Sequence, residues 1–221
     1  MQWFEQGQAV QWAEAGGVAL GAYLLGCFTT GYYLVRWWSG RDLRQLGSGT
    51  VGARNAGRTL GWQGFLLTML GDAAKGAVAV AGTQYFTHDD RLAGLALVSV
   101  VIGHIWPAQL HFHGGKGIAT SLGGLGMYEF RLALAVAFCF VLMYALVRKT
   151  VMSGLFAFTC LPLIALYLQT VSDGLGSDAA QLICVSFITV LIVVAHRKNG
   201  VEGLSNFLER SSVRKHHPPE P

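Results

Sequence analysis

The chain has 221 residues, of which 52% are hydrophobic and only 13% charged, and its formal net charge is +4. A soluble domain usually carries about 25% charged residues. The composition therefore excludes an ordinary soluble protein and indicates an all-α, polytopic integral membrane protein.

Seven apolar runs follow one another along the chain. A membrane span needs about 20 residues, and we expect spans at 16–36, 60–84, 92–110, 131–148, 152–170 and 179–196. The run 117–127 is short and rich in glycine, which predicts a half-span or re-entrant helix buried in protein. We expect one transmembrane domain over residues 1–210 and a short, disordered cytoplasmic tail over 211–221.

The loops between these runs alternate in charge. All lysines and arginines except Lys75, Arg91 and Arg131 lie in the loops 36–59, 111–116 and 148–151 or in the C-terminal tail, whereas the opposite segments are acidic. Because basic loops stay in the cytoplasm, this pattern predicts an outside N-terminus, a cytoplasmic C-terminus and an odd number of crossings, seven rather than six. The basic residues are spread over short loops, so we expect contact with membrane lipids and no nucleic-acid partner.

The cytoplasmic loop 47–61, GSGTVGARNAGRTLG, is dense in glycine. Its backbone can turn N–H groups toward a ligand, and Ser48, Asn55 and Arg58 add side-chain donors. A phosphate group needs many converging donors, so this composition favours a phosphate-binding loop. The alternative is a flexible linker whose arginines only keep the loop in the cytoplasm.

The second polar segment, GHIWPAQLHFHGGKGIAT at 103–120, ends in a stretch similar to a P-loop. The pattern GxxxxGK[ST] needs glycine at 110 and serine or threonine at 117, but the chain has Leu110 and Gly117, which excludes a nucleotide P-loop. Lys116 between glycines at a predicted helix N-terminus still makes a good anion site. His104, alone in an apolar span, is interpreted as a hydrogen-bonded core residue, with a catalytic base as the alternative.

Two further polar groups lie in or beside spans. His196 and Asn199, in AHRKNGVEG, stand at the cytoplasmic end of the last span, where an ordinary solvated helix end is the alternative. Asp72 and Lys75, in GDAAKG, lie inside a span, and their spacing allows an ion pair that we interpret as structural and next to the site. The three loop segments are predicted to form one basic, phosphate-binding cleft at the inner membrane surface.

Several reaction classes are excluded by missing motifs. The chain contains no HxxxxD, GxSxG or HExxH pattern and no aspartate cluster for Mg²⁺. Its four cysteines lack the spacing of a zinc site, and we expect no metal and no cofactor. An enzyme of this sequence must work by positioning phosphate-bearing substrates and by stabilising charge.

The segments GSGTVGARNAGRTLG, GDAAKG, GHIWPAQLHFHGGKGIAT and HRKN occur in the order found in one family. Over nearly its whole length the chain resembles the bacterial membrane glycerol-3-phosphate acyltransferases that use acyl phosphate as donor. The resemblance implies transfer of a fatty acyl group from acyl phosphate to the 1-hydroxyl of glycerol 3-phosphate, the first acylation of phospholipid synthesis. The products would be 1-acyl-glycerol 3-phosphate (lysophosphatidic acid) and inorganic phosphate.

The resemblance also implies a location and a set of site residues. It implies a multi-pass protein of the bacterial inner membrane, a cytoplasmic active site and a functional link to the enzyme that makes acyl phosphate. By position, the catalytic residues would be Ser48, Arg58, Lys116, His196 and Asn199. The substrate- and phosphate-binding residues would be Gly47, Gly49, Gly52, Asn55, His104, Gly114, Gly115, Gly117 and Ser153.

The chain departs from the family pattern at several positions. The family usually has GSGN and GATN where this chain has Thr50 and Arg54, and its isoleucine after HRxN is Gly200 here. Of the family's serine-rich stretch after the fifth span, only Thr150 and Ser153 remain. The alternative function is a membrane carrier for a phosphorylated solute, which would hold its ligand near the bilayer midplane between related repeats. A scaffold protein is a third reading.

Overall fold

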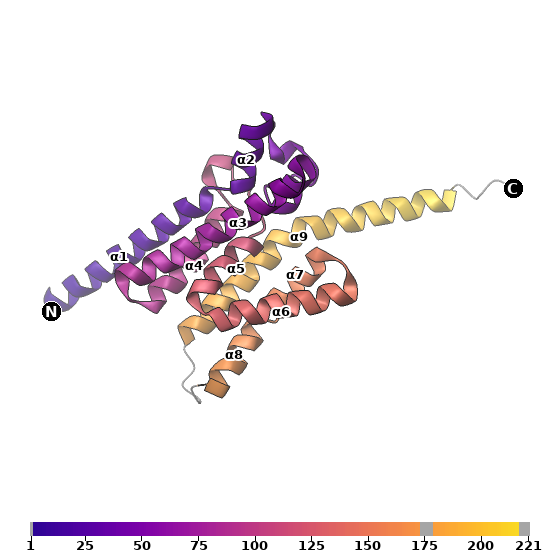
Figure 1. The fold of residues 1–221 in the computed structure, drawn as a ribbon. Helices are drawn as coiled ribbons and strands as arrows, with labels where there is room; N and C mark the ends of the chain where they lie inside the picture. The colour runs from indigo at the N-terminus through magenta and orange to yellow at the C-terminus, as the bar shows by residue number, and fades with distance from the viewer. Residues whose placement is uncertain (1, 173–178, 217–221) are drawn as a thin grey trace.

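The structure is a computed structural model that describes residues 2–172 and 179–216, with side chains over 11–171 and 179–197. All regular elements within these residues are helices, which confirms the all-α class (Figure 1). The long N-terminal and C-terminal helices extend from opposite ends of a central bundle. The α-helices are α1 (Gln2–Cys27), α2 (Thr30–Ser39), α3 (Ala53–Thr87), α4 (Asp90–Ile105), α5 (Ile118–Tyr128), α6 (Phe130–Val147), α7 (Thr150–Thr159), α8 (Leu161–Ser172) and α9 (Ala179–His216), and the 3₁₀ helices are η1 (Leu43–Gln45) and η2 (Ala108–Leu110).

Among the described residues, five stretches are long and apolar enough to cross a membrane, and a sixth is added if the bent pair α7–α8 counts as one span. The five stretches are Gln11–Ser39, Ala53–Thr87, Asp90–Leu110, Phe130–Val147 and Ala179–Arg197. The seven expected runs thus correspond to these six and to α5. Large apolar side chains cover the outward faces of the bundle, as a bilayer requires; Phe138 and Leu146 on α6 are 68% and 72% exposed.

Helix α5 is the run that does not span the bilayer by itself. Its 11 residues make a helix about 16 Å long at about 1.5 Å per residue, half of a typical hydrocarbon core. Neighbouring elements limit the helix at both ends. The residues before it belong to η2, which begins after Pro107, and to the following loop, while Glu129 directly after it is the N-cap of α6. The run thus forms a short helix of the length expected for a half-span.

Helix α5 packs antiparallel to α4 and against α3. Its N-terminal side lies beside His104 at the end of α4, because Gly115 contacts the His104 ring, while Tyr128 at its other end lies against Gly94. On the α3 side, a Cβ at Gly76 or at Gly123 would overlap the backbone of Thr120 or of Ala73. These glycines let α3 and α5 approach to backbone contact.

The helical path breaks or bends at three places that lie inside continuous apolar stretches of the sequence. The expected span 16–36 breaks between α1 and α2, α7 and α8 meet at a bend of 40°, and α3 has a kink at Gly61 (φ 72°, ψ −162°). The kink separates residues 53–60 from the long part of α3. This short helical segment carries Arg54 and Arg58, the two arginines of the first glycine-rich loop.

A small second core lies beneath the loops. The larger core takes residues from α1 and from α3 through α9, whereas the second consists of Val35, Leu43, Val51, Ala56 and Leu110. Its members come from α2, from the segment 43–56 and from η2. The first and second glycine-rich loops therefore share one apolar support.

Candidate active site

Asn55 organises the first glycine-rich loop from below. Its side chain is buried, and Nδ2 donates to the backbone carbonyls of Leu43, Leu46 and Thr50 at 3.1, 2.8 and 2.9 Å. Its Oδ1 accepts from the backbone N–H of Ser48 at 3.1 Å. The amide was expected to contact phosphate, but all of its hydrogen-bonding groups are used within the loop.

The exposed side of this loop presents Ser48 and Arg58. The Ser48 hydroxyl shares a hydrogen bond of 3.1 Å with the Thr50 hydroxyl, and both face outward. Gly47 adopts φ 54°, and a Cβ there would overlap Asn55 Oδ1 and come 3.7 Å from Arg58 Cδ. The left-handed backbone and the lack of space both require glycine at this position. Arg58 consequently passes directly over the loop that carries Ser48.

The second glycine-rich loop is fastened to the end of α4. Gly114 N–H donates to the carbonyl of Ile105 at 3.1 Å, and Gly115 N–H donates to that of His104 at 3.0 Å. Lys116 follows, half-buried, and Gly117 is the N-cap of α5. The loop thus places a lysine and a helix N-terminus at one point.

Arg44 connects the two loops. Its Nη1 donates to the carbonyl of Leu110 at 3.1 Å, while Nη2 and Nε bind the Asp42 carboxylate at 2.7 and 3.2 Å. The guanidinium also lies 5.3 Å from the centre of the Tyr32 ring. The hydrogen bonds from Arg44 hold the pKa of Asp42 below its usual value. Apart from its closeness to Asp42, nothing in the sequence marks Arg44 as a residue of the site.

Three cations gather where the two loops meet. Arg54 and Arg58 lie one turn apart on the first segment of α3, and both are exposed. Burial lowers the pKa of Lys116, and the nearby charge of Arg54 lowers it further. Within the described residues none of the three makes an ion pair. Arg54 entered the sequence analysis only as a departure from a family pattern.

The helix N-termini at this place carry no side-chain caps. The N-cap residues of α3 and α5 are Gly52 and Gly117, and neither end receives a capping side chain. Both helix N-termini therefore present the positive end of the helix dipole without a capping side chain. Together with the cations they form an electropositive surface suited to phosphate groups.

His196 lies at the end of the last candidate span, close to Lys116. It is buried, within electrostatic range of the Lys116 ammonium, and its Nδ1 lies 2.7 Å from the carbonyl of Ile192. A carbonyl can only accept, so Nδ1 carries the ring proton and Nε2 keeps a lone pair in the neutral ring. Asn199 lies outside the residues whose side chains the structure describes.

Ser153 lies near this end of the bundle, although its hydroxyl is occupied. The side chain is buried, and Oγ donates to the carbonyl of Lys149 at 3.0 Å. A Cβ on the next residue, Gly154, would meet Ile118 Cδ1 at 3.0 Å, which places the start of α7 against the start of α5. Ser153 therefore lies beside the second loop with its hydroxyl turned back into α7.

The pair Asp72 and Lys75 lies one layer deeper. Lys75 Nζ is 3.1 Å from Asp72 Oδ1 and 2.8 Å from His104 Nδ1, and all three residues are buried. The expected ion pair therefore exists, and His104 is part of it. His104 is thus a hydrogen-bonded core residue whose ring lies against Gly115.

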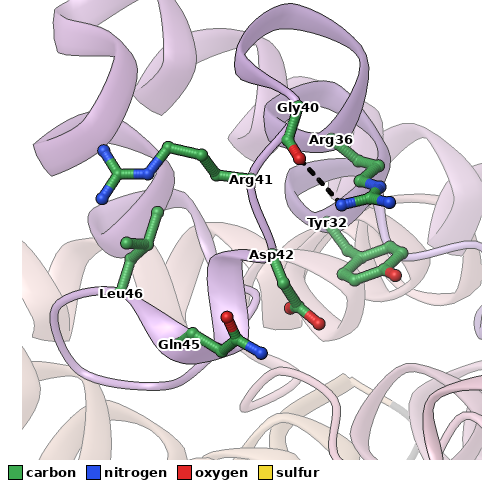
Figure 2. A pocket seen from close by; sticks show the side chains of 7 residues that line it. All are labelled: Tyr32, Arg36, Gly40, Arg41, Asp42, Gln45 and Leu46. Carbon is green, nitrogen blue, oxygen red and sulfur yellow. Dashed lines mark hydrogen bonds between the residues drawn. The ribbon is translucent and has the colours of Figure 1, made fainter.

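A cavity of about 510 Å³ opens beside the first loop. Figure 2 shows its lining, which comes from α2, η1 and the turn between them; the residues are Tyr32, Arg36, Gly40, Arg41, Asp42, Gln45 and Leu46. Arg36 Nη1 donates to the carbonyl of Gly40 at 2.7 Å. None of the expected catalytic residues lines this cavity, so it borders the site without containing the reacting groups.

Comparison with known proteins gives a consistent result. The family model described as glycerol-3-phosphate acyltransferase matches residues 17–205. Glycerol-3-phosphate acyltransferase 1 of Desulfitobacterium hafniense is 43% identical over 196 residues, which cover 89% of this chain and 92% of that protein. The glycerol-3-phosphate acyltransferase of Clostridioides difficile is 35% identical over 203 residues, 90% of this chain and 95% of the relative.

Solved structures agree with the sequence relatives. The crystal structure of the integral membrane glycerol 3-phosphate acyltransferase PlsY in its glycerol 3-phosphate form matches with a TM-score of 0.76 and 28% identity. Its lysophosphatidic acid form matches with a TM-score of 0.74 and 26% identity. Each match covers 87% of this chain and 92% of the other.

Proposed function

The chain belongs to the glycerol-3-phosphate acyltransferase family and is a multi-pass membrane enzyme that forms lysophosphatidic acid, and we propose that its acyl donor is acyl phosphate. In this reaction the 1-hydroxyl of glycerol 3-phosphate attacks the acyl carbonyl carbon. A carbon–oxygen ester bond forms, the bond between acyl carbon and phosphate oxygen breaks, and inorganic phosphate leaves. The hydroxyl proton is taken up by a base.

The cluster of Arg54, Arg58 and Lys116 is the observation that carries this proposal. Both substrates bear a phosphate group, so the reacting pair brings several negative charges to one place. Within the described residues these three cations make no ion pair, and together with the two uncapped helix N-termini they supply matching positive charge. We assign Arg58, with the Ser48 hydroxyl, to one phosphate and Lys116 to the other. Backbone N–H groups of the glycine loops would stabilise the developing oxyanion.

His196 is the proton acceptor in this proposal. Its Nδ1 proton is held by the Ile192 carbonyl, so Nε2 is the free basic nitrogen. The neutral ring, with its lone pair on Nε2, is the form that can accept a proton. A phosphate oxygen of the substrate is the alternative acceptor.

Asn55 and Gly47 act by shaping the first loop rather than by touching substrate. The Asn55 amide is saturated by the backbone around it. Gly114 and Gly115 act in the same way on the second loop through their bonds to α4. We therefore keep these residues in the substrate site as positioning residues. The helix N-termini at Gly52 and Gly117 would offer backbone N–H groups to the phosphates, whereas the Gly49 N–H already donates to the Leu46 carbonyl at 3.0 Å and helps to shape the loop.

We place the loops at the cytoplasmic side of a bacterial inner membrane, with the N-terminus outside. The antiparallel packing supports counting α5, together with the loop before it, as one crossing, because Tyr128 at the end of α5 lies against Gly94 near the start of α4. With α5 counted as a crossing, seven crossings separate the two termini. The basic loops 36–59, 111–116 and 148–151 then all lie on the cytoplasmic side.

Phosphate release by the purified protein tests the proposal. Palmitoyl phosphate plus glycerol 3-phosphate should yield lysophosphatidic acid and inorganic phosphate, with both substrates required. Acyl-CoA and acylated carrier protein should give no product. Lys116→Ala and Arg58→Ala should each reduce turnover on the order of 10² or more, as the loss of one charge clamp does. Arg91→Ala, at the opposite end of the bundle, is the matched control.

The alternative outcomes are equally clear. Near-wild-type phosphate release by both variants would rule out the assignment of the phosphate clamp. Product formation from acyl-CoA would overturn the proposed donor. Uptake of glycerol 3-phosphate into vesicles without product would instead support a carrier.

A further inference from the structure

The buried Lys75 takes no part in the proposed reaction, yet it touches the support of the second glycine-rich loop. Lys75 is 5% exposed, and its neighbours Asp72 and His104 are 2% and 3% exposed. Lys75 Nζ lies 2.9 Å from the Gly26 carbonyl, 2.8 Å from the Phe28 carbonyl, 3.1 Å from Asp72 Oδ1 and 2.8 Å from His104 Nδ1. Four acceptors thus surround three ammonium protons.

On one side this group joins the break between α1 and α2. A helix end leaves carbonyls without intrahelical partners, and the Gly26 and Phe28 carbonyls at the break both accept from Lys75. Beyond the break, the backbone N–H of Thr30 donates to Asp72 Oδ1 at 3.3 Å. The ion pair therefore satisfies backbone groups on both sides of the interruption.

On the other side this group fixes the ring of His104. An ammonium can only donate, so His104 Nδ1 accepts and Nε2 carries the ring proton. The Nε2 edge faces Gly115, where a Cβ would overlap the ring; its three nearest atoms would be Nε2, Cε1 and Cδ2 of His104. Gly115 N–H also donates to the His104 carbonyl at 3.0 Å. The contact with the His104 ring and the hydrogen bond to the His104 carbonyl together fix the position of Gly115.

We propose that Lys75 is a positioning residue for the substrate loop. Lys75 sets the orientation of the His104 ring, the ring sets the backbone at Gly115, and Gly115 sets where Lys116 and the N-terminus of α5 stand. This inference rests on the proposed role of Lys116 in phosphate binding. It predicts that a change at Lys75 alters substrate affinity without touching substrate.

Steady-state kinetics of Lys75→Met and His104→Ala test the first two links. Each should raise the KM for glycerol 3-phosphate about tenfold or more, as the loss of a supporting partner of a site residue does, with a smaller change in kcat. The control is Thr189→Val, which removes an interhelical hydrogen bond of 2.8 Å to the Phe158 carbonyl far from the loop. It should lower Tm and leave KM unchanged.

A double-mutant cycle tests the last link. Gly115→Ala should raise KM strongly, because the three atoms nearest to the new methyl group all belong to the His104 ring. Adding His104→Ala removes that obstacle, so the double variant should recover at least about tenfold of the loss. Contacting residues show such non-additivity, whereas independent ones add.

The outcomes separate this inference from the proposed function. If Lys75→Met and His104→Ala behave like Thr189→Val, or if the cycle is additive, Lys75 is only structural and the inference is overturned. If Lys116→Ala binds and turns over substrate normally, the proposed function has failed instead. Should Lys75→Met not fold, Asp72→Asn/Lys75→Met removes the unpaired charge and gives the same kinetic test.

Discussion

Arg44 donates a hydrogen bond to the backbone carbonyl of Leu110 at 3.1 Å, across 66 positions of sequence. This single contact ties the first glycine-rich loop to the second. Because both carboxylate oxygens of Asp42 accept hydrogen bonds from the same guanidinium, its orientation toward Leu110 is fixed. The spacing of the phosphate-binding groups depends on it.

Replacing Arg44 by alanine should loosen both loops at once. We expect the free energy of unfolding to fall on the order of 2 kcal/mol, the usual loss for hydrogen bonds to a charged group, and the KM for glycerol 3-phosphate to rise. Arg44→Lys should rescue little, since an ammonium cannot bind Asp42 and Leu110 in the same fork. Thermal unfolding and kinetics measure both effects. Arg41→Ala, an exposed neighbour, is the control, and an equal effect there would contradict the link.

Replacing Asn55 by alanine should collapse the first loop. The change leaves three carbonyls and the Ser48 N–H without their partner, at a cost of about 1–3 kcal/mol for an unsatisfied buried group. We expect kcat/KM to fall on the order of 10² because Ser48 and Arg58 lose their positions. Asn55→Asp should not rescue, since a carboxylate accepts but does not donate.

A neighbouring hydroxyl provides the control for Asn55. Thr59 Oγ1 donates to the Asn55 carbonyl at 3.3 Å from the same helix face. Thr59→Ala should leave kcat/KM close to the wild-type value. A normal rate for Asn55→Ala in folded protein would mean that the loop does not need this amide.

The alkaline limb of kcat/KM should report Lys116 and respond to Arg54. Burial and then the charge of Arg54 lower the pKa of Lys116 from its usual value, and only the ammonium form holds phosphate. Activity should therefore decline at a lower pH than an ordinary lysine would impose. Arg54→Thr removes one cause and should move the limb to higher pH, whereas Arg54→Lys should not. Rates from about pH 7 to pH 10.5 test this, and an unmoved limb in Arg54→Thr would refute it.

The lowered pKa of Lys116 also determines the direction in which the free energy of unfolding changes with pH. Between the folded and the unfolded pKa of Lys116, the unfolded chain binds more protons. The free energy of unfolding should therefore rise with pH across this window. Lys116→Met removes the contribution, so the difference in Tm between variant and wild type should shrink as the pH climbs through the window.

Replacing His196 should slow chemistry more than binding. With Nε2 as the proton acceptor, His196→Ala should lower kcat by about 10²–10⁴-fold and change the KM for glycerol 3-phosphate little. The control is His88→Asn at the other end of α3, where asparagine tolerates the left-handed backbone (φ 51°). A raised KM with unchanged kcat would assign His196 to binding and the proton to a phosphate oxygen.

Much of the fold follows from composition and hydropathy, because long apolar runs leave few alternatives to membrane helices. The positions at which the helices break do not follow from composition or hydropathy. The interruption after Phe28 and the bend at Cys160 lie inside apolar stretches, and an average over a window conceals them. At the first break the freed carbonyls of Gly26 and Phe28 accept hydrogen bonds from Lys75, a partner distant in sequence that no local pattern reveals.

The sequence predicted which residue types make up the site, but not the directions in which their side chains point. The glycine, serine and arginine content of 47–58 indicates a phosphate loop, yet nothing in that pattern shows that the Asn55 amide turns inward. Arg44 escaped prediction because its partner Leu110 contributes only a backbone carbonyl, which leaves no mark in the sequence. Long-range contacts to main-chain atoms are invisible to motif analysis.

The backbone contact of α3 with α5 has a consequence for lipid traffic. At Gly76 and Gly123 the two helices leave no space for even a methyl group. A fatty chain cannot lie between them. The hydrocarbon tail of substrate or product must therefore reach the loops along a path other than the seam between α3 and α5.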